Sequence, residues 1–449
     1  MVKDKRAVTL EQSEKYSEDF RANRAYVVAS RAVVQNGILE SAQDYEAAGK
    51  LSPHFSIDLK QGKITNQKAS GRCWIFAALN TFRYEVMQNL KLNDFELSQN
   101  YLFFYDKLEK ANMYLENMLA IKDEPVDGRL YAFLNQDPLQ DGGQWDMLAN
   151  LVRKYGVIPK DIYPEAKSAE NSRWLKESLS SKLRESGVRL RKAAAEEKKS
   201  GTELRKMKLS MLNEIYRMLA IGLGEPPKRF DFVITDKDNK VTQDFDITPV
   251  EFFEKYVRVD LDSRVSLVNA PAEDKPMNRM YTVKYLGNVA EGKRVEYCNL
   301  EMKTIKNAVI KQLKDGHPVW FGSDCAKFGL RKGGYFDRQS ASIEELFDIR
   351  YEFTKGERLI YGDSAMNHAM VILGVNLDKN GNPDKWRIEN SWGKDSGMEG
   401  YYVASDAWFD EFVYQVVVDK KYLSKKTLTL FEQEPVALEP WDPLGTLAD

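Results

Sequence analysis

Two hydrophobic patterns divide the chain. Apolar residues three and four positions apart run through most of the first half, whereas apolar and polar residues alternate from about residue 229 onward. The first pattern is typical of amphipathic helices and the second of half-buried strands. We expect residues 9–48 to form a helical arm packed against the main body and residues 166–220 to form charged, partly exposed helices. Strands should be densest at 366–425, and the proline-containing end should be a tail without regular structure.

The stretch "NQKASGRCWIFAALN" at residues 66–80 places a cysteine at the start of a predicted helix. Ser70 is a candidate N-cap, so Cys73 falls in the first turn. One buried face is predicted from the apolar residues Ile75, Phe76, Leu79, Phe82, Val86 and Leu90. The positive end of the helix dipole stabilises a thiolate, which is the nucleophilic form of cysteine. Taken alone, however, Cys73 fits a small buried hydrophobe better than a reactive thiol.

Composition narrows the class of protein. The 449 residues are 43% hydrophobic and carry a formal net charge of −2, so nothing favours strong attraction to nucleic acid or anionic lipid. No run of about 18 apolar residues and no secretory leader pattern is seen, which predicts a soluble, cytoplasmic protein. The three cysteines, Cys73, Cys298 and Cys325, are too few for a disulfide framework and lack the spacing of a zinc site. We therefore expect no metal and no organic cofactor.

A reactive thiol needs a base, and the chain offers three histidines. His54 lies in an irregular stretch and His317 at a helix-to-strand junction, so structural roles are favoured for both. His368 begins the strand-like run "HAMVILGV", which a turn connects to "WRIENSWG". A hairpin centred near Lys379 would place His368 opposite Asn390, within reach of a hydrogen bond that fixes the imidazole.

Two further side chains complete a candidate catalytic group. Gln67 brings an N–H donor near Cys73, and together with the backbone N–H of Cys73 it would form an oxyanion hole. Trp392, two residues after Asn390, would shield the hydrogen bond between Asn390 and His368 from water. A thiol, an imidazole, an orienting amide and an oxyanion donor are the groups that acyl transfer requires.

These motifs resemble a papain-like cysteine peptidase and, more narrowly, the bleomycin hydrolase and bacterial aminopeptidase C family. The segments that carry the resemblance are "NQKASGRCWIF", "DGGQW", "MNHAMVILGV" and "IENSWG". It implies Cys73 as nucleophile, His368 as general acid and base, Asn390 as its orienter and Gln67 as oxyanion donor. It also implies contacts with substrate from Gly142, Gly143 and Asn367. "SGRCW" departs from the papain signature C-G-[SA]-C-[WY], because Ser70 stands where secreted relatives have a disulfide-bonded cysteine.

The resemblance implies an α+β, two-lobed papain-like fold with helical and strand insertions and a C-terminal arm. The divisions are an N-terminal helical arm (1–60), a helical lobe with the nucleophile (61–165), an inserted region for oligomerisation (166–300), a β-rich lobe (301–425) and a C-terminal arm (426–449). The arm would direct Ala448 and Asp449 toward the α-ammonium of a peptide substrate, and which tail group clamps the amine stays open. The resemblance also implies a homohexamer.

The predicted function is a cysteine aminopeptidase that removes N-terminal residues from peptides through a thiolate–imidazolium pair and an acyl-enzyme. A papain-like endopeptidase whose tail leaves the cleft open is the first alternative. A nucleic-acid-binding or scaffold hexamer without peptidase activity is the second, and the net charge of −2 disfavours nucleic acid.

Overall fold

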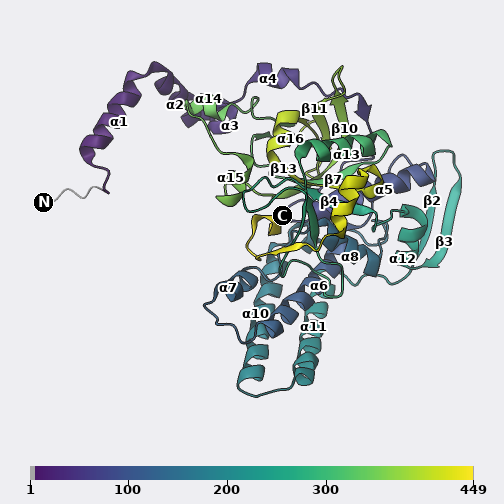
Figure 1. The fold of residues 1–449 in the computed structure, drawn as a ribbon. Coiled ribbons are helices and arrows are strands. Elements are labelled where there is room, and N and C mark those ends of the chain that lie inside the picture. The colour runs from purple at the N-terminus through teal and green to yellow at the C-terminus, as the bar shows by residue number, and fades with distance from the viewer. Residues whose placement is uncertain (1–5, 448–449) are drawn as a thin grey trace.

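Residues 6–447 are described by the computed structural model, in which a helical lobe packs against a strand-rich lobe (Figure 1). Helix α5 (Cys73–Leu90) lies between the two lobes, and every residue from Cys73 to Tyr84 is buried. The prediction of a single buried face was therefore wrong: other helices cover one side of α5 and strands cover the other. Helices α6 (Gln99–Ala120) and α8 (Trp145–Tyr155) contact α5, and α10 (Arg173–Ala195) and α11 (Gly201–Leu223) pack on α6. The short helices α7 (Arg129–Gln136) and α9 (Lys167–Glu170) also belong to this part of the chain.

One sheet of the described chain holds twelve strands, in the order β14-β5-β6-β4-β13-β7-β10-β11-β12-β9-β8 with β1 added beside β10. These strands are β1 (Ile57–Asp58), β4 (Arg264–Val268), β5 (Arg279–Val283), β6 (Glu296–Asn299), β7 (Val319–Ser323), β8 (Gly329–Leu330), β9 (Tyr335–Phe336), β10 (His368–Leu377), β11 (Pro383–Glu389), β12 (Tyr401–Ser405), β13 (Val413–Asp419) and β14 (Val436–Leu438). Three of them, β4 to β6, come from the region expected as an insertion.

Strand β10 is covered on both faces, which explains its nearly continuous apolar sequence. Ala369, Val371 and Leu373 pack into the core shared with the helical lobe. Met370 and Ile372 point into a second core with α13 (Met302–Lys314) and α16 (Asp406–Phe412). His368 is the first residue of this strand, so its backbone is fixed by the packing of both cores.

The remaining elements lie around this centre. A separate hairpin of β2 (Phe230–Thr235) and β3 (Val241–Ile247) precedes the short helix α12 (Pro249–Phe252) and a π-helical turn at Phe253–Val257. After β9 the chain also forms the short helices α14 (Ile343–Phe347), α15 (Lys355–Ile360) and α17 (Lys425–Leu428), together with single 3₁₀ turns. Among residues 6–447, no helix has the length and apolarity needed to cross a membrane.

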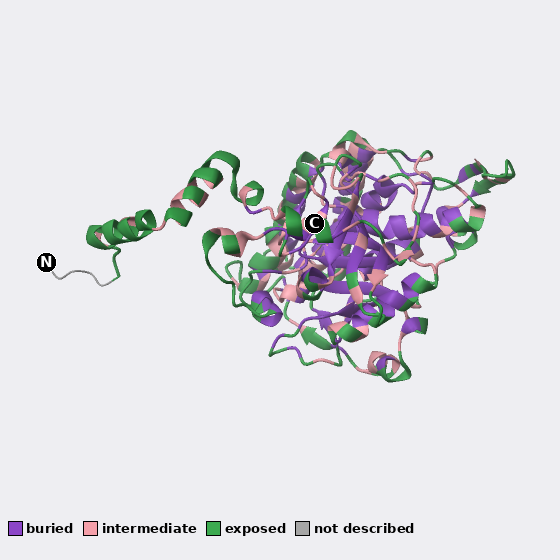
Figure 2. Ribbon diagram, turned by 90° about the horizontal axis from the view of Figure 1, so that it is seen from above, coloured by how far each residue is buried: buried purple, intermediate pink, exposed green. Residues whose placement is uncertain are grey.

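The N-terminal segment forms α1 (Leu10–Ala22), α2 (Arg24–Asn36), α3 (Ile38–Ser41) and α4 (Tyr45–Lys50). It differs from the expected packed arm, because α1 and α2 contain no buried residue and extend away from the body (Figure 2). A hydrogen bond from Tyr26 Oη to Asp348 Oδ2, 2.7 Å long, connects α2 to the loop after α14. Apolar side chains such as Leu10 and Val34 are consequently exposed on these helices.

The C-terminal segment is structured, contrary to the prediction of an irregular tail. Strand β14 pairs in parallel with β5 at one edge of the sheet, and a 3₁₀ turn follows at Pro443–Gly445. An ion pair of 2.9 Å between Asp442 and the buried Lys275 fixes the turn to the body. Leu444 is buried. The segment shows no local periodicity, so its structure depends on pairing and packing with residues that are distant in the chain.

Candidate active site

Cys73 is the first residue of α5, and its side chain is buried at the junction of the two lobes. Its Sγ accepts a hydrogen bond of 3.4 Å from the backbone N–H of Ala369 in β10. The first N–H groups of a helix lack acceptors within it, so the site offers both the positive end of the dipole and free donors. Ser70 does not cap the helix as predicted. The N-cap is Arg72, and the Ser70 hydroxyl donates instead to the carbonyl of Gln67.

His368 and Asn390 meet as the sequence predicted, with 2.9 Å between Nε2 and Oδ1. The backbone N–H of Ser391 donates to the same Asn390 oxygen at 2.8 Å. This second donor identifies the atom as the amide oxygen, so Nε2 of His368 must carry the proton that it donates. The imidazole is therefore held with Nδ1 as its unprotonated nitrogen, which is the nitrogen available to exchange a proton with a thiol.

The predicted register of the hairpin was wrong, although the contact is right. A turn centred at Lys379 would pair Ile372 with Trp386, whereas Ile372 faces Ile388 and the ladder has two irregularities. The last pair is Val371 with Glu389, before either catalytic candidate is reached. Bulges shift a strand by a residue and are not visible in an alternating pattern.

Trp392 covers the imidazole. Its ring stacks on the His368 ring with 4.8 Å between centroids and 28° between planes. The guanidinium of Arg331 lies over the Trp392 ring at 4.1 Å, and Tyr402 meets the same ring edge-on. The histidine is thus enclosed by an aromatic side chain that is itself held by a cation.

Burial lowers the pKa of His368 to about 4, and the positive charge of Arg331 acts in the same direction. The hydrogen bond to Asn390 opposes this shift. At neutral pH and beside a protonated thiol, the imidazole is therefore neutral and can accept a proton. Once Cys73 is ionised, the negative sulfur favours the imidazolium, because an adjacent opposite charge stabilises the charged form.

Gln67 is held close to the nucleophile by both ends of its amide. The Oε1 atom accepts a hydrogen bond of 2.6 Å from Ser391 Oγ, and Nε2 donates to the Ser70 carbonyl at 2.7 Å. An amide nitrogen has two N–H groups, so one remains for an oxyanion. Ser391 was not predicted. Its place beside Asn390 in "IENSWG" was the only signal that the sequence offered.

The glycine pair lies against the nucleophile helix, but its two members differ. The carbonyl of Gly142 is already occupied by the Lys110 ammonium, at 2.7 Å. At Gly143 a Cβ atom would lie 2.6 Å from the Trp74 ring, so only glycine fits the close approach. The Gly142 carbonyl is thus used within the protein, and Gly143 fixes the close packing of this loop against the nucleophile helix.

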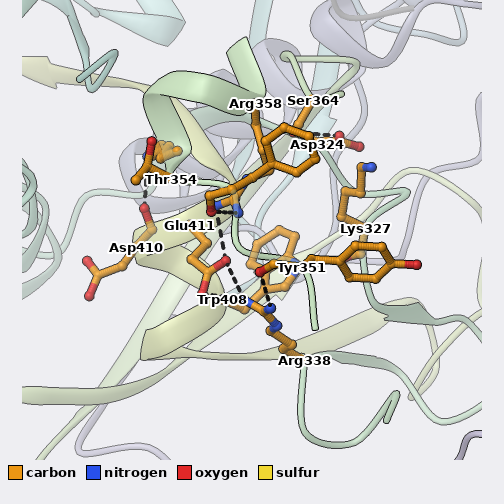
Figure 3. A network of polar contacts seen from close by, with 12 residues as sticks. Asp324, Lys327, Arg338, Tyr351, Thr354, Arg358, Ser364, Trp408, Asp410 and Glu411 are labelled. Atoms are coloured by element: carbon orange, nitrogen blue, oxygen red, sulfur yellow. Dashed lines mark hydrogen bonds and ion pairs between the residues drawn. The ribbon is translucent and has the colours of Figure 1, made fainter. Parts of the chain in front are cut away.

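The Asn367 side chain does not point into the site. Its Nδ2 donates to Asp324 Oδ1 at 2.6 Å, and its Oδ1 accepts from the backbone N–H of Cys325 at 3.2 Å. Both ends of the Asn367 side-chain amide are therefore hydrogen-bonded within the protein. Asp324 also accepts a 2.7 Å hydrogen bond from Ser364 Oγ, within a polar network that fixes the segment leading to His368 (Figure 3).

That network continues through charged groups (Figure 3). Glu411 accepts hydrogen bonds from Arg338 and from Arg358 at 3.0 Å each. It thus connects α16 to α15, which contains Arg358, and to the loop after β9, which contains Arg338. Sequence reasoning did not find Asp324, Arg358 or Glu411, because a charged residue in a sequence usually indicates exposed surface.

The C-terminal segment reaches the same edge of the site as the glycine pair. Gln144 Nε2 donates to the carbonyl of Thr446 at 2.6 Å. Gly445 and Leu447 line a cavity together with Lys110 and Gln140. Ala448 and Asp449, the predicted contacts with the substrate amine, lie outside the described residues.

The other thiols and histidines are unsuited to this chemistry. Burial raises the pKa of Cys298 to about 12, and burial together with the nearby Asp324 carboxylate does the same for Cys325. Nδ1 of His317 contacts Glu85 Oε1 at 2.7 Å, and His54 is exposed. Within residues 6–447, no cluster of three or more His, Cys, Asp or Glu side chains is arranged to hold a metal ion.

Comparisons with known proteins define the family. The model of the peptidase C1-like family matches residues 7–445. The chain is 48% identical over 440 residues to aminopeptidase C of Lactobacillus delbrueckii subsp. lactis, covering 96% of this chain and 97% of that protein. It is 46% identical over 441 residues to aminopeptidase C of Listeria monocytogenes, with 98% and 99% covered.

A solved structure agrees with this assignment. PepW from Lactobacillus rhamnosis superposes with a TM-score of 0.97 at 47% identity, over 99% of this chain and all of that one. The chain therefore belongs to the peptidase C1-like family and has its α+β, papain-like fold, as the sequence motifs predicted.

Proposed function

We propose that this chain is a cysteine aminopeptidase, which hydrolyses the first peptide bond of substrates with a free N-terminus. The observation that carries the proposal is the junction of α5 and β10. It brings a cysteine at a helix N-terminus together with a histidine whose tautomer is set by Asn390. The near full-length similarity to proteins named aminopeptidase C supports the exopeptidase specificity.

The chemistry follows from these groups. The Cys73 thiol transfers its proton to Nδ1 of His368, and the sulfur attacks the peptide carbonyl. The oxyanion that forms accepts hydrogen bonds from the Cys73 backbone N–H and the remaining N–H of Gln67. His368 then gives the proton to the leaving amine, which departs as the thioester forms. Water, deprotonated by His368, hydrolyses the thioester and restores the thiol.

The C-terminal segment supports a preference for free N-termini. Its described part accepts a hydrogen bond from Gln144, and Gly445 and Leu447 line a cavity beside the loop of the glycine pair. We infer from this position that the segment occupies space that the preceding residues of a longer substrate would need. An acetylated or extended N-terminus would then clash with this segment, whereas a free N-terminus would not.

The test is cleavage of two fluorogenic aminoacyl coumarin amides, one with a free amine and one acetylated, by wild type and by Cys73→Ala. Turnover of the free-amine substrate alone, lost in Cys73→Ala, is the expected result. Equal turnover of both would make the protein an endopeptidase of the same family. Turnover of neither, in folded protein, would contradict the proposal.

We also propose a cytoplasmic homohexamer acting on peptides. The projecting helices α1 and α2 carry exposed apolar side chains, and so does the segment between residues 347 and 361. Such surfaces are typical of interfaces between subunits. Cys73, Cys298 and Cys325 form no disulfide with one another, which suits a reducing compartment. A stable monomer in analytical ultracentrifugation would contradict the assembly, and recovery with the secreted fraction would contradict the location.

A further inference from the structure

Two buried lysines hold the loop that carries the glycine pair. Nζ of Lys110 donates to the carbonyls of Gln140 and Gly142, at 2.8 and 2.7 Å. Nζ of Lys107, one helical turn earlier on α6, donates to the carbonyls of Leu139 and Gln140, at 3.0 and 2.9 Å. Each ammonium group thus donates two of its three N–H groups to carbonyls of this loop.

The third interaction of each lysine is an ion pair with a buried carboxylate. Lys110 pairs with Asp106 at 2.8 Å and Lys107 with Asp141 at 2.6 Å. All four side chains are at least 94% buried. Charges so deeply buried are costly unless each has a partner, so a chain that needed only packing here would be served by apolar residues. We call these four residues the lysine clamp.

The lysine clamp also contacts the loop of the nucleophile. Asp141 Oδ2 accepts a hydrogen bond of 3.3 Å from the backbone N–H of Gly71, and the Asp141 carbonyl accepts one of 2.8 Å from Trp74 Nε1. Gly71 and Trp74 flank Cys73 closely in sequence. The glycine loop and the nucleophile loop are therefore joined through one residue.

Ser70 stands where the papain signature has a cysteine, so a disulfide from that position cannot form. The lysine clamp connects the glycine loop to the nucleophile loop by ionic contacts instead. Such contacts persist in a reducing compartment, where disulfides are rare.

The loop at residues 139–144, which carries the glycine pair, also binds the C-terminal segment, because Gln144 at its end donates a hydrogen bond to the carbonyl of Thr446. Lys110 itself lines the cavity that Gly445 and Leu447 border. A shift of the loop would move Gln144, and the C-terminal segment would lose its hydrogen bond to the loop.

We propose that Lys110 and Lys107 are positioning residues for specificity: by fixing loop 139–144 to the nucleophile loop, they hold the C-terminal segment where it excludes blocked N-termini. This inference rests on the proposed aminopeptidase function. It assigns the preference for free amines to a buried charge network as well as to the C-terminal segment.

The test compares Lys110→Met with Lys355→Met. Lys355 is a matched control, because it is a buried lysine of the other lobe whose Nζ also donates to two carbonyls, those of Asp410 and Val413. The ratio of kcat/KM for the free-amine substrate to that for the acetylated substrate should fall about tenfold or more in Lys110→Met. Alkylation of Cys73 by iodoacetamide, which does not use the loop, should change less than about twofold. Lys355→Met should lower stability without changing the ratio.

Limited proteolysis provides a readout that does not depend on activity. Cleavage within residues 440–447 should be faster in Lys110→Met than in wild type or Lys355→Met. If Lys110→Met does not fold, Asp106→Asn replaces it, because loss of that carboxylate frees the ammonium to move from the loop. An unchanged ratio and unchanged proteolysis in a folded variant would overturn the inference. If wild type fails to distinguish the two substrates, the proposed function fails, and proteolysis alone decides the role of the lysine clamp.

Discussion

His368 Nε2 lies 2.9 Å from Asn390 Oδ1, although the ladder between their strands has already ended at Val371 and Glu389. The contact is therefore made beyond the paired part of the hairpin. Hydrogen bonds from Ser391 and the stacked ring of Trp392 support it there. The contact between His368 and Asn390 thus depends on these local interactions and not on the ladder between β10 and β11, whereas the backbone of His368 is paired on its other side with Ser323 of β7.

Removing that contact should slow catalysis. In Asn390→Ala the imidazole loses the acceptor that fixes its tautomer, so the wrong nitrogen can carry the proton. We expect kcat/KM to fall by about a hundredfold, with KM changing much less than kcat. Asn380→Ala, in the exposed turn of the same hairpin, is the control and should retain full activity. Unchanged kinetics in Asn390→Ala would remove the proposed role of Asn390.

The pH dependence should reflect the burial of His368. A neutral imidazole must accept the thiol proton, and this imidazole stays neutral until the pH falls through its lowered pKa of about 4. Activity should therefore be lost near pH 4 and not near 6.5, the ordinary pKa of histidine. In Trp392→Ala water reaches the ring, which should raise the pKa and move the acid limb of kcat/KM toward 6.5. An acid limb at the same pH in both proteins would show that Trp392 does not control this pKa.

A buried ion pair should stabilise the junction of the lobes. Arg83 of α5 and Glu389 of β11 are fully buried and 2.6 Å apart, and Asn80 also donates to Glu389. Arg83→Met leaves the carboxylate without its cation, which should reduce the free energy of unfolding by about 3–5 kcal/mol. Urea unfolding measures this loss. The double variant Arg83→Met/Glu389→Gln should recover part of it, and equal losses in the single and double variants would show that the charge is not the cause.

Gly143→Ala should disturb the glycine loop by collision. The new Cβ would lie 2.6 Å from the ring of Trp74, and that ring is held by its hydrogen bond to the Asp141 carbonyl. We expect a loss of about 1–3 kcal/mol in stability and a lower kcat/KM. Gly201→Ala, which meets open space at the start of α11, should be neutral or slightly stabilising. Wild-type stability and activity in Gly143→Ala would mean that the loop can shift without consequence.

Local patterns predicted the elements that carry the site. The helix that carries Cys73 and the two strands around His368 and Asn390 were visible in spacing and turn chemistry. These predictions succeeded because a helix start or a hairpin depends on residues close in sequence. The N-cap at Ser70 failed, because its hydroxyl finds the Gln67 carbonyl and the guanidinium of Arg72 instead.

What the sequence determined by itself was the set of candidate reacting groups and the elements that carry them: a thiol at a helix start, a histidine at the start of one strand, an asparagine directly after the neighbouring strand, and a glutamine ahead of the thiol. Only the tertiary structure decided the two-residue offset of the hairpin, the outward course of α1 and α2, and the pairing of β14 with β5. It alone brought Lys110 to the Gly142 carbonyl. Bulges, unpartnered faces and buried charges depend on neighbours far away in the chain, and a local pattern of apolar and polar residues does not record which neighbours those are.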